Sequence, residues 1–239
     1  MNALKPFWSY YGAKYSRARH YPKPKHNLLI EPFAGSACYA LHYPDINVIL
    51  MDIDPVICGI WDYLIKVRPS EIMQLPDIVN SLDEIQHLPQ EARALIGFWF
   101  VRGRSYPAKS FSAWGRDPQW HIHAHFWGKL AKERIASQVD RIKHWQVFNL
   151  RYSDIGELYA TWFIDPPYVV GGHRYKFNTK TINYEHLTLW CQTRPGLSIV
   201  CEGKGADWLP FIELGEFSCA TKKTRVTELV YVRENPAIS

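Results

Sequence analysis

The most informative stretch of the sequence is Thr161-Trp162-Phe163-Ile164-Asp165-Pro166-Pro167-Tyr168. Its first four residues are mostly β-formers and predict a buried strand, which an aspartate and two prolines end abruptly. Each proline fixes its own φ and lacks an N–H, and Pro167 also holds Pro166 extended, so the turn is stiff. A stiff turn at the carboxyl end of a strand places the Asp165 carboxylate, the Pro166 carbonyl and the Tyr168 ring at the rim of a sheet. In open α/β sheets this rim is where ligands bind.

The residue types at this turn suit an exocyclic amine. A carboxylate and a carbonyl, both acceptors, can hold the two N–H donors of a planar amino group. A neighbouring phenol can stack on the ring that carries the amine. The turn therefore predicts a site that presents an amino group of a nucleobase to an electrophile. The alternative is an ordinary strand and turn in which Asp165 caps a helix and Tyr168 packs in the core.

Length and composition limit the possible classes of protein. The 239 residues fit one large domain, or one domain with a sizeable insertion, and can bury a core without cross-links. No apolar run approaches the ~20 residues needed to span a bilayer, and no apolar secretory core follows Met1. The five cysteines form no CxxC pair, so the pattern predicts reduced thiols rather than a disulfide framework or zinc knuckle. We expect a cytoplasmic protein without a membrane partner.

Basic residues concentrate in one segment of a chain whose net charge is +5. Between Gln90 and Gln146 there are ten Lys and Arg against four Asp and Glu, interleaved with aromatic residues. This mixture suits phosphate neutralisation combined with base stacking, although a solvated basic face is the simpler alternative. The candidate nucleic-acid contacts in this segment and after Gly171 are Arg102, Arg104, Lys109, Trp114, Arg116, Arg174 and Lys176.

Two further strands are expected to end at polar turns near the same rim. The strand 27–31 ends at Glu31 and runs into the small-residue turn 32–37, followed by a helical pattern at 38–41. Such a turn lets backbone N–H groups approach a nucleotide-like ligand closely, but it is not GxGxxG, so a dinucleotide fold is not specifically implied. The strand 48–51 ends at Asp52, an acidic residue about twenty positions after the glycine turn, which can take both hydroxyls of a ribose.

The remaining patterns predict the other elements of an α/β fold. Asp54 and Pro55 predict the N-cap and first residue of a helix. Short helical pieces are expected after residue 68, a long loop at 101–119, a helix at 127–145 with Leu130 inward and Lys132 outward, a strand at 147–150 followed by Asp154, a helix at 185–191, a strand at 197–201, and a terminal hairpin of 216–221 with 227–232. His121, His123 and His125 would share one face of a strand, but no cysteine or carboxylate completes a zinc site, and no metal is expected.

These motifs, in this order, resemble the D12-class (α-ordered) DNA adenine-N6 methyltransferases over nearly the whole chain. The family's aromatic-x-Gly-x-Lys motif is matched at 10–14, its cofactor motif at 31–36, its acidic ribose site at Asp52 and its DPPY motif at 165–168. The stretches 112–117 and 134–140 are similar to phage and prophage members. One departure is Ala37, where the family often has a second glycine.

The resemblance implies a Rossmann-like S-adenosylmethionine-dependent fold, a mixed sheet with a terminal β-hairpin, and an inserted, mainly helical target-recognition region. The catalytic domain would comprise 1–68 and 147–239, and the insertion 69–146. The cofactor S-adenosylmethionine would be bound by Tyr10, Gly12, Lys14, Glu31, Phe33, Gly35, Ser36, Asp52, Ile53, Asp154 and Asp165. The catalytic motif would be Asp165, Pro166, Pro167 and Tyr168, acting on an adenine extruded from double-stranded DNA, as in a restriction-modification system.

Other functions remain open at this stage. The same arrangement fits N4 of cytosine, for which the family more often has serine in place of Asp165. A non-catalytic DNA-binding protein that retains the fold is a second alternative, which cofactor binding would discriminate. An RNA or protein amine is a third, although the basic aromatic segment fits nucleic acid better.

Overall fold

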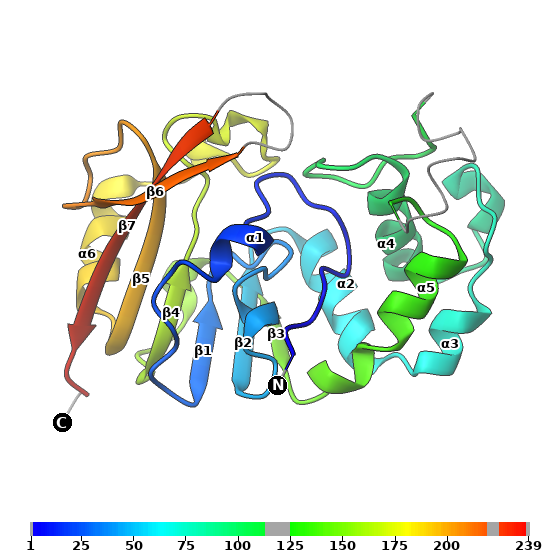
Figure 1. Cartoon of the computed structure of the whole chain (residues 1–239), viewed down its shortest axis with the longest axis horizontal. Helices are drawn as coiled ribbons and strands as arrows, with labels where there is room; N and C mark the ends of the chain where they lie inside the picture. The colour runs from blue at the N-terminus through cyan, green and yellow to red at the C-terminus, as the bar shows by residue number, and fades with distance from the viewer. Residues whose placement is uncertain (1, 113–124, 219–224, 238–239) are drawn as a thin grey trace.

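A seven-stranded mixed sheet in the order β3-β2-β1-β4-β5-β7-β6 organises the molecule (Figure 1). The computed structural model describes residues 2–112, 125–218 and 225–237. The strands are β1 (Leu28–Glu31), β2 (Asn47–Asp52), β3 (Gln146–Asn149), β4 (Ala160–Ile164), β5 (Gly196–Gly203), β6 (Ile212–Ser218) and β7 (Arg225–Asn235). Pairing is parallel from β3 through β5, and β7 runs antiparallel to both of its neighbours. The architecture is α/β and compatible with a Rossmann-like fold.

The central strands follow directly from their composition. All five residues of β4 are buried, as are the first seven of β5, which is the continuous apolar pattern of a parallel strand covered on both faces. The terminal hairpin is also confirmed, with β6 and β7 longer than the expected 216–221 and 227–232. β6 is the half-exposed edge strand of the sheet.

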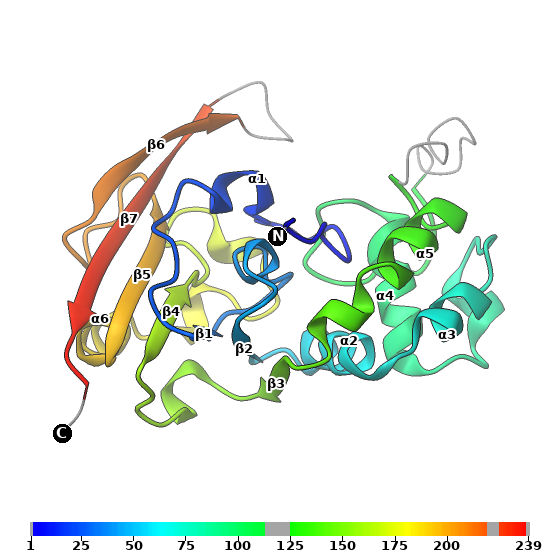
Figure 2. The same ribbon diagram turned by 60° about the horizontal axis from the view of Figure 1, so that its bottom comes forward.

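Helices cover both faces of the sheet (Figure 2). The α-helices are α1 (Tyr15–Ala18), α2 (Pro55–Lys66), α3 (Pro69–Gln74), α4 (Gln90–Phe100), α5 (Lys129–Ala136) and α6 (Tyr184–Thr193). Successive residues of a strand face opposite ways, so Leu29 of β1 joins a core with α1 and α2, while Ile30 joins a second core with α6. The start of α2 is as expected, since the Asp54 side chain accepts a hydrogen bond from Val56 N–H at 3.0 Å.

The helix expected at 38–41 is wrong. Only a 3-10 turn, η1 (Ala40–His42), follows the small-residue turn after β1. The next residue, Tyr43, has φ −130° and ψ 52° and precedes Pro44. A proline disfavours the α conformation of the residue before it, so the chain turns back toward β2 before an α-helix can form.

The long helix expected at 127–145 is also divided. α5 ends at Ala136, and the 3-10 turn η5 (Val139–Ile142) follows. Leu130 is exposed, whereas Lys132 is buried and donates to the carbonyls of Met73 and Leu75 at 3.0 and 2.5 Å. The expected positions of Leu130 and Lys132 are thus reversed, whereas Ile135, Val139 and Ile142 of the same segment are buried. Lys132 is buried because its ammonium caps the carboxyl end of α3, whose last carbonyls have no partner inside their own helix.

The helices between α2 and β3 gather beyond the β3 edge of the sheet (Figure 1). They share the larger hydrophobic core with the N-terminal segment and α2: the Trp8 ring lies 4.9 Å from Trp61 of α2 and 6.0 Å from Phe98 of α4. Because one core joins both parts, the division into 1–68 with 147–239 and an inserted 69–146 stays a prediction. None of the helices that the structure describes is long and apolar enough to cross a bilayer.

A substitution at Gly196 tests how closely β5 packs against β4. Its φ is +88°, and an added Cβ would stand 2.1 Å from the carbonyl oxygen of Ala160. We expect Gly196→Ala to lower the free energy of unfolding by about 2–4 kcal/mol through strain and displacement of β4. Gly205→Ala is the matched control, with φ +98° but no atom within 4 Å of the added Cβ, and should cost about 1 kcal/mol. Urea denaturation measures both, and equal losses would contradict the packing argument.

Candidate active site

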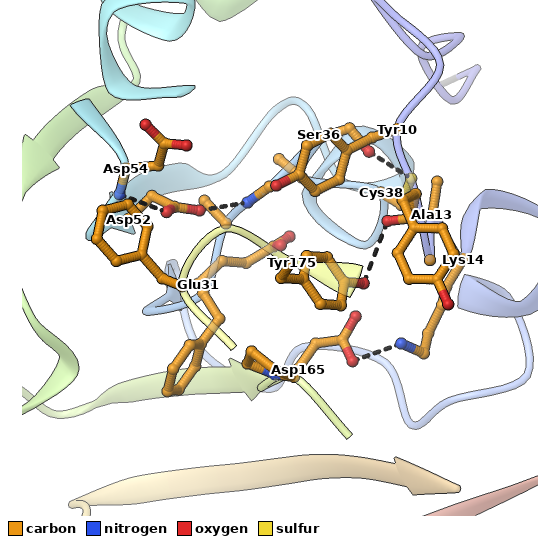
Figure 3. Close-up of a pocket in the computed structure, with 18 of the residues that line it drawn as sticks. Tyr10, Ala13, Lys14, Glu31, Ser36, Cys38, Asp52, Asp54, Asp165 and Tyr175 are labelled. Atoms are coloured by element: carbon orange, nitrogen blue, oxygen red, sulfur yellow. Dashed lines mark hydrogen bonds and ion pairs between the residues drawn. The ribbon is translucent and has the colours of Figure 1, made fainter. Parts of the chain in front are cut away.

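A pocket opens at the carboxyl ends of β1, β2 and β4 (Figure 3). It encloses about 700 Å³ including its mouth. The lining residues are Tyr10, Tyr11, Gly12, Ala13, Lys14, Glu31, Phe33, Ala34, Gly35, Ser36, Ala37, Cys38, Asp52, Ile53, Asp54, Phe163, Asp165, Pro167, Tyr175 and Phe177. Most of the residues expected to bind a cofactor are therefore brought together, from four separate stretches of the chain.

The turn after β1 is tied to the end of β2 by Asp52. One carboxylate oxygen accepts the N–H of Gly35 at 2.9 Å, and the other accepts the N–H of Asp54 at 2.9 Å. Burial raises the pKa of Asp52 to about 6, although these backbone donors oppose the shift. A carboxylate has about four lone-pair positions, so Asp52 retains acceptor capacity for hydroxyl groups of a ligand.

Ala37 occupies a backbone conformation that favours glycine. Its φ is +47°, and it is the one non-glycine residue with positive φ among those the structure describes. An alanine in this left-handed region costs about 1–2 kcal/mol. Ala37, which stands where D12-class methyltransferases often have a second glycine, is therefore a strained residue at the pocket wall. The turn keeps its shape despite the methyl group.

Glu31 places a second buried carboxyl in the pocket. It is 2% exposed and accepts the N–H of Ala40 at 2.6 Å. Burial raises the pKa of Glu31 to about 8, with the nearby Asp165 carboxylate acting in the same direction. A cationic ligand group would favour the ionised form of Glu31 and lower this pKa.

Asp165 forms a buried ion pair with Lys14, as Figure 3 shows. The Lys14 side chain is 6% exposed and that of Asp165 24%. Burial raises the pKa of Asp165, while the Lys14 ammonium opposes the shift. The same ammonium lies 4.4 Å from the centre of the Tyr168 ring. The Lys14 ammonium thus contacts both the Asp165 carboxylate and the Tyr168 ring, the two groups that were expected to receive the target base.

The other members of the proline turn differ in their relation to the pocket. Pro167 lines it, whereas Pro166 and Tyr168 are not lining residues. Tyr168 is behind Lys14, with its hydroxyl donating to Glu228 of β7. Asp154 is exposed in the 3-10 turn η6 (Tyr152–Asp154) and accepts the N–H of Arg151 at 3.2 Å, so it takes no part in the pocket. Its neighbour Tyr152 lies 5.4 Å from the ring of pocket-lining Phe33. The segment after β3 therefore reaches the rim, but the Asp154 side chain is exposed and does not line the pocket.

Tyr175 was missed by the sequence analysis, which singled out its neighbours. Its hydroxyl donates to the carbonyl of Tyr11 at 3.2 Å, and its ring lies in the middle of the pocket, between the side of Asp52 and that of Asp165 (Figure 3). A Cβ at Gly12, where φ is +72°, would stand 2.0 Å from the Tyr175 oxygen. The only available signal was the pair of glycines before Tyr175, which lets residues 171–177 fold over the site.

Three segments form the mouth of the pocket. Tyr11 N–H donates to the Arg104 carbonyl at 3.0 Å, and the Ser105 hydroxyl donates to the Arg174 carbonyl at 2.8 Å. The loop after α4 is thereby joined to the N-terminal segment and to residues 171–177. Basic side chains of these loops therefore lie near the opening.

The residues expected to contact nucleic acid lie in different parts of the structure. Arg102 and Arg174 are exposed, and the Arg104 guanidinium lies 5.0 Å from the Tyr106 ring. The exposed Lys176 lies 3.7 Å from Asp54 at the pocket wall. Lys109 is exposed farther along the loop after α4, where its carbonyl accepts from the N–H of Leu82 in the 3-10 turn η2 (Leu82–Ile85) at 2.8 Å. Trp114 and Arg116 lie outside the described residues, as do His121 and His123.

Among the described residues, no three His, Cys, Asp or Glu side chains gather as metal ligands.

The Lys14–Asp165 ion pair should contribute strongly to stability. We expect Lys14→Met to lower the free energy of unfolding by about 2–4 kcal/mol, because it leaves a buried carboxylate without its cation. The double variant Lys14→Met/Asp165→Asn should lose less than the sum of the single variants. The exposed pair Lys66–Asp62 is the matched control, and Lys66→Met should cost less than about 0.5 kcal/mol. Urea denaturation that gives additive losses at Lys14 and Asp165 would contradict the coupling.

Comparison with known proteins leaves the site to be interpreted on its own geometry. No protein-family model matches the chain, and its sequence has no match among curated proteins. The chemistry of the pocket is therefore the basis for any assignment of function.

Proposed function

We propose that this chain is a site-specific DNA methyltransferase that uses S-adenosylmethionine to methylate N6 of adenine. The observation that supports this most directly is the convergence of Glu31, Asp52 and Asp165 in one pocket, from the carboxyl ends of three adjacent parallel strands. Ligands of open α/β sheets bind at such strand ends. The pocket joins a nucleoside-type subsite at Asp52 to an amine-accepting group at Asp165.

The side chains of the pocket fit S-adenosylmethionine. Among the lining residues, Lys14 is the only Lys or Arg, whereas four are Asp or Glu. A ligand that carries both an ammonium and a sulfonium would be favoured there. Asp52 would accept the ribose hydroxyls, Ile53 and Phe33 would contact the adenine ring, and Glu31 would face the ammonium. The bound cofactor supplies an electrophilic methyl group.

The target amine would take the place of the Lys14 ammonium. That ammonium already donates to Asp165 and lies over the Tyr168 ring, which are the two partners that the amine of a stacked base would use. The Asp165 carboxylate and the Pro166 carbonyl would hold the two N–H groups and favour a pyramidal nitrogen, whose lone pair is then free for in-line attack. No strong general base is required, because the proton can leave after the methyl group has been transferred.

The basic loops at the mouth support a DNA substrate. Arg102, Arg104 and Arg174 lie on segments that are hydrogen-bonded to one another around the opening, where they would neutralise phosphates. An adenine that is stacked and paired inside a duplex cannot reach Asp165, which lies within the pocket. The base must therefore leave the stack, at a cost of a few kcal/mol that stacking and pocket hydrogen bonds offset.

Removal of the Asp165 carboxylate tests the assignment. We expect Asp165→Ala to abolish methyl transfer while S-adenosylmethionine still binds, because the variant lacks the acceptor for the target amine. Mass spectrometry of nucleosides from treated, unmethylated genomic DNA would measure transfer and distinguish N6-methyladenine from N4-methylcytosine. Calorimetry would measure cofactor binding. Asp154→Ala is the matched control, since Asp154 is an exposed carboxylate outside the pocket, and it should retain both properties. Normal turnover by Asp165→Ala would remove Asp165 from the mechanism.

Cofactor binding should depend on pH through Asp52. The pKa of Asp52 is raised to about 6 in the free protein, and hydroxyl donors prefer the ionised carboxylate. Affinity is therefore full above this pKa and lost as the pH falls through it, by up to about tenfold per pH unit. Calorimetry with S-adenosylhomocysteine between pH 5 and 7 would measure the dependence. Asp52→Asn should bind more weakly but with a flatter profile, and an unchanged profile in this variant would exclude Asp52 as the titrating group.

A further inference from the structure

Glu228 of β7 is a buried carboxylate behind the turn that follows β4. Its side chain is 1% exposed. One oxygen accepts from the Arg17 guanidinium at 2.8 Å, and the other accepts from the Tyr21 hydroxyl at 2.6 Å and from the Tyr168 hydroxyl. Because a buried charge is costly unless it is fully paired, these three donors together hold the carboxylate in one orientation.

The Tyr168 ring is also confined along its length. Gly203 of β5 pairs with Glu228 of β7, and a Cβ at Gly203 would stand 3.0 Å from the ring carbon Cδ2. The ring therefore packs directly against the β5 backbone. The N–H of the next residue, Val169, donates to Glu202 at 3.3 Å. Burial raises the pKa of Tyr168 well above its ordinary value, so the phenol keeps the proton that it donates.

We propose that Glu228 is a positioning residue for the target base. By holding the Tyr168 hydroxyl, it fixes the position of the ring on which the base stacks, next to the Asp165 carboxylate. This role rests on the proposed function. It adds to that function by assigning the placement of the stacking ring to β7, a strand of the terminal hairpin. The hydroxyl oxygen lies on the axis about which the ring turns, so the hydrogen bond to Glu228 fixes the direction of the side chain. Packing of the ring against Gly203 limits rotation about that axis.

The consequence for the reaction concerns geometry rather than charge. A base stacked on a tilted ring would present its amine out of line with Asp165. Misplacement of a reacting group lowers the rate of the chemical step. Loss of the Glu228 contact should therefore lower kcat more than it raises KM for DNA, since the basic loops that bind the duplex are unchanged.

A double-mutant cycle between Glu228 and Tyr168 tests this role. Glu228→Met keeps the side-chain length but removes the acceptor, and we expect kcat on unmethylated genomic DNA to fall roughly tenfold. In the Tyr168→Phe background, which lacks the hydroxyl, the same change should have little further effect. Glu228→Gln, whose amide oxygen can still accept from Tyr168, should recover part of the lost rate.

Tyr21→Phe is the matched control, because it removes the other hydroxyl from the same Glu228 oxygen and should leave kcat near the wild-type value. If Glu228→Met does not fold, Glu228→Asp replaces it, since the shorter side chain keeps a charge near Arg17 but withdraws from the Tyr168 hydroxyl. If Glu228→Met lowers kcat equally with and without the Tyr168 hydroxyl, in a protein that methylates DNA, the role of Glu228 is overturned and the proposed function stands. A wild-type protein that binds S-adenosylmethionine but transfers no methyl group would overturn the proposed function, and this role with it.

Discussion

The buried ion pair between Lys14 and Asp165 joins the N-terminal segment to the carboxyl end of β4, and the pocket depends on this contact. The sheet alone would leave Asp165 at an open rim. The segment around Gly12 and Lys14 crosses that rim and closes one side of the site. Because burial opposes ionisation of both partners, each requires the other to remain charged. The same pair places a positive charge where the proposed reaction requires an amine.

An excess of buried carboxyl groups distinguishes the rest of the site. Burial raises the pKa values of Glu31 and Asp52, so the protein without a ligand holds these groups partly protonated near neutral pH. A cationic ligand would favour their ionised forms. The energetic cost of burying these carboxyl groups is in this way linked to affinity for a positively charged ligand.

The turn after β4 is supported from two directions. On its pocket side, Asp165 and Tyr168 share the Lys14 ammonium. On the opposite side, Glu228 and Glu202 of the neighbouring strands hold the Tyr168 hydroxyl and the Val169 N–H. The antiparallel hairpin therefore has a structural purpose beyond closing the sheet. Its β7 strand brings the Glu228 carboxylate to the back of the turn after β4.

Local pattern alone was sufficient for the strands, the cap of α2 and the residues at the strand ends, because alternation, proline and small-residue turns act within a few positions of the chain. It failed where distant groups decided the outcome. Lys132 is buried because it caps α3. The pattern after Gly35 does not continue as a helix because Pro44 follows. The Asp154 side chain is exposed to solvent and does not line the pocket. The Lys14–Asp165 pair, the position of Tyr175 and the contact of Glu228 with Tyr168 join residues far apart in the chain. Only the packing of the folded sheet brings such groups together, since no spacing in the sequence encodes those distances.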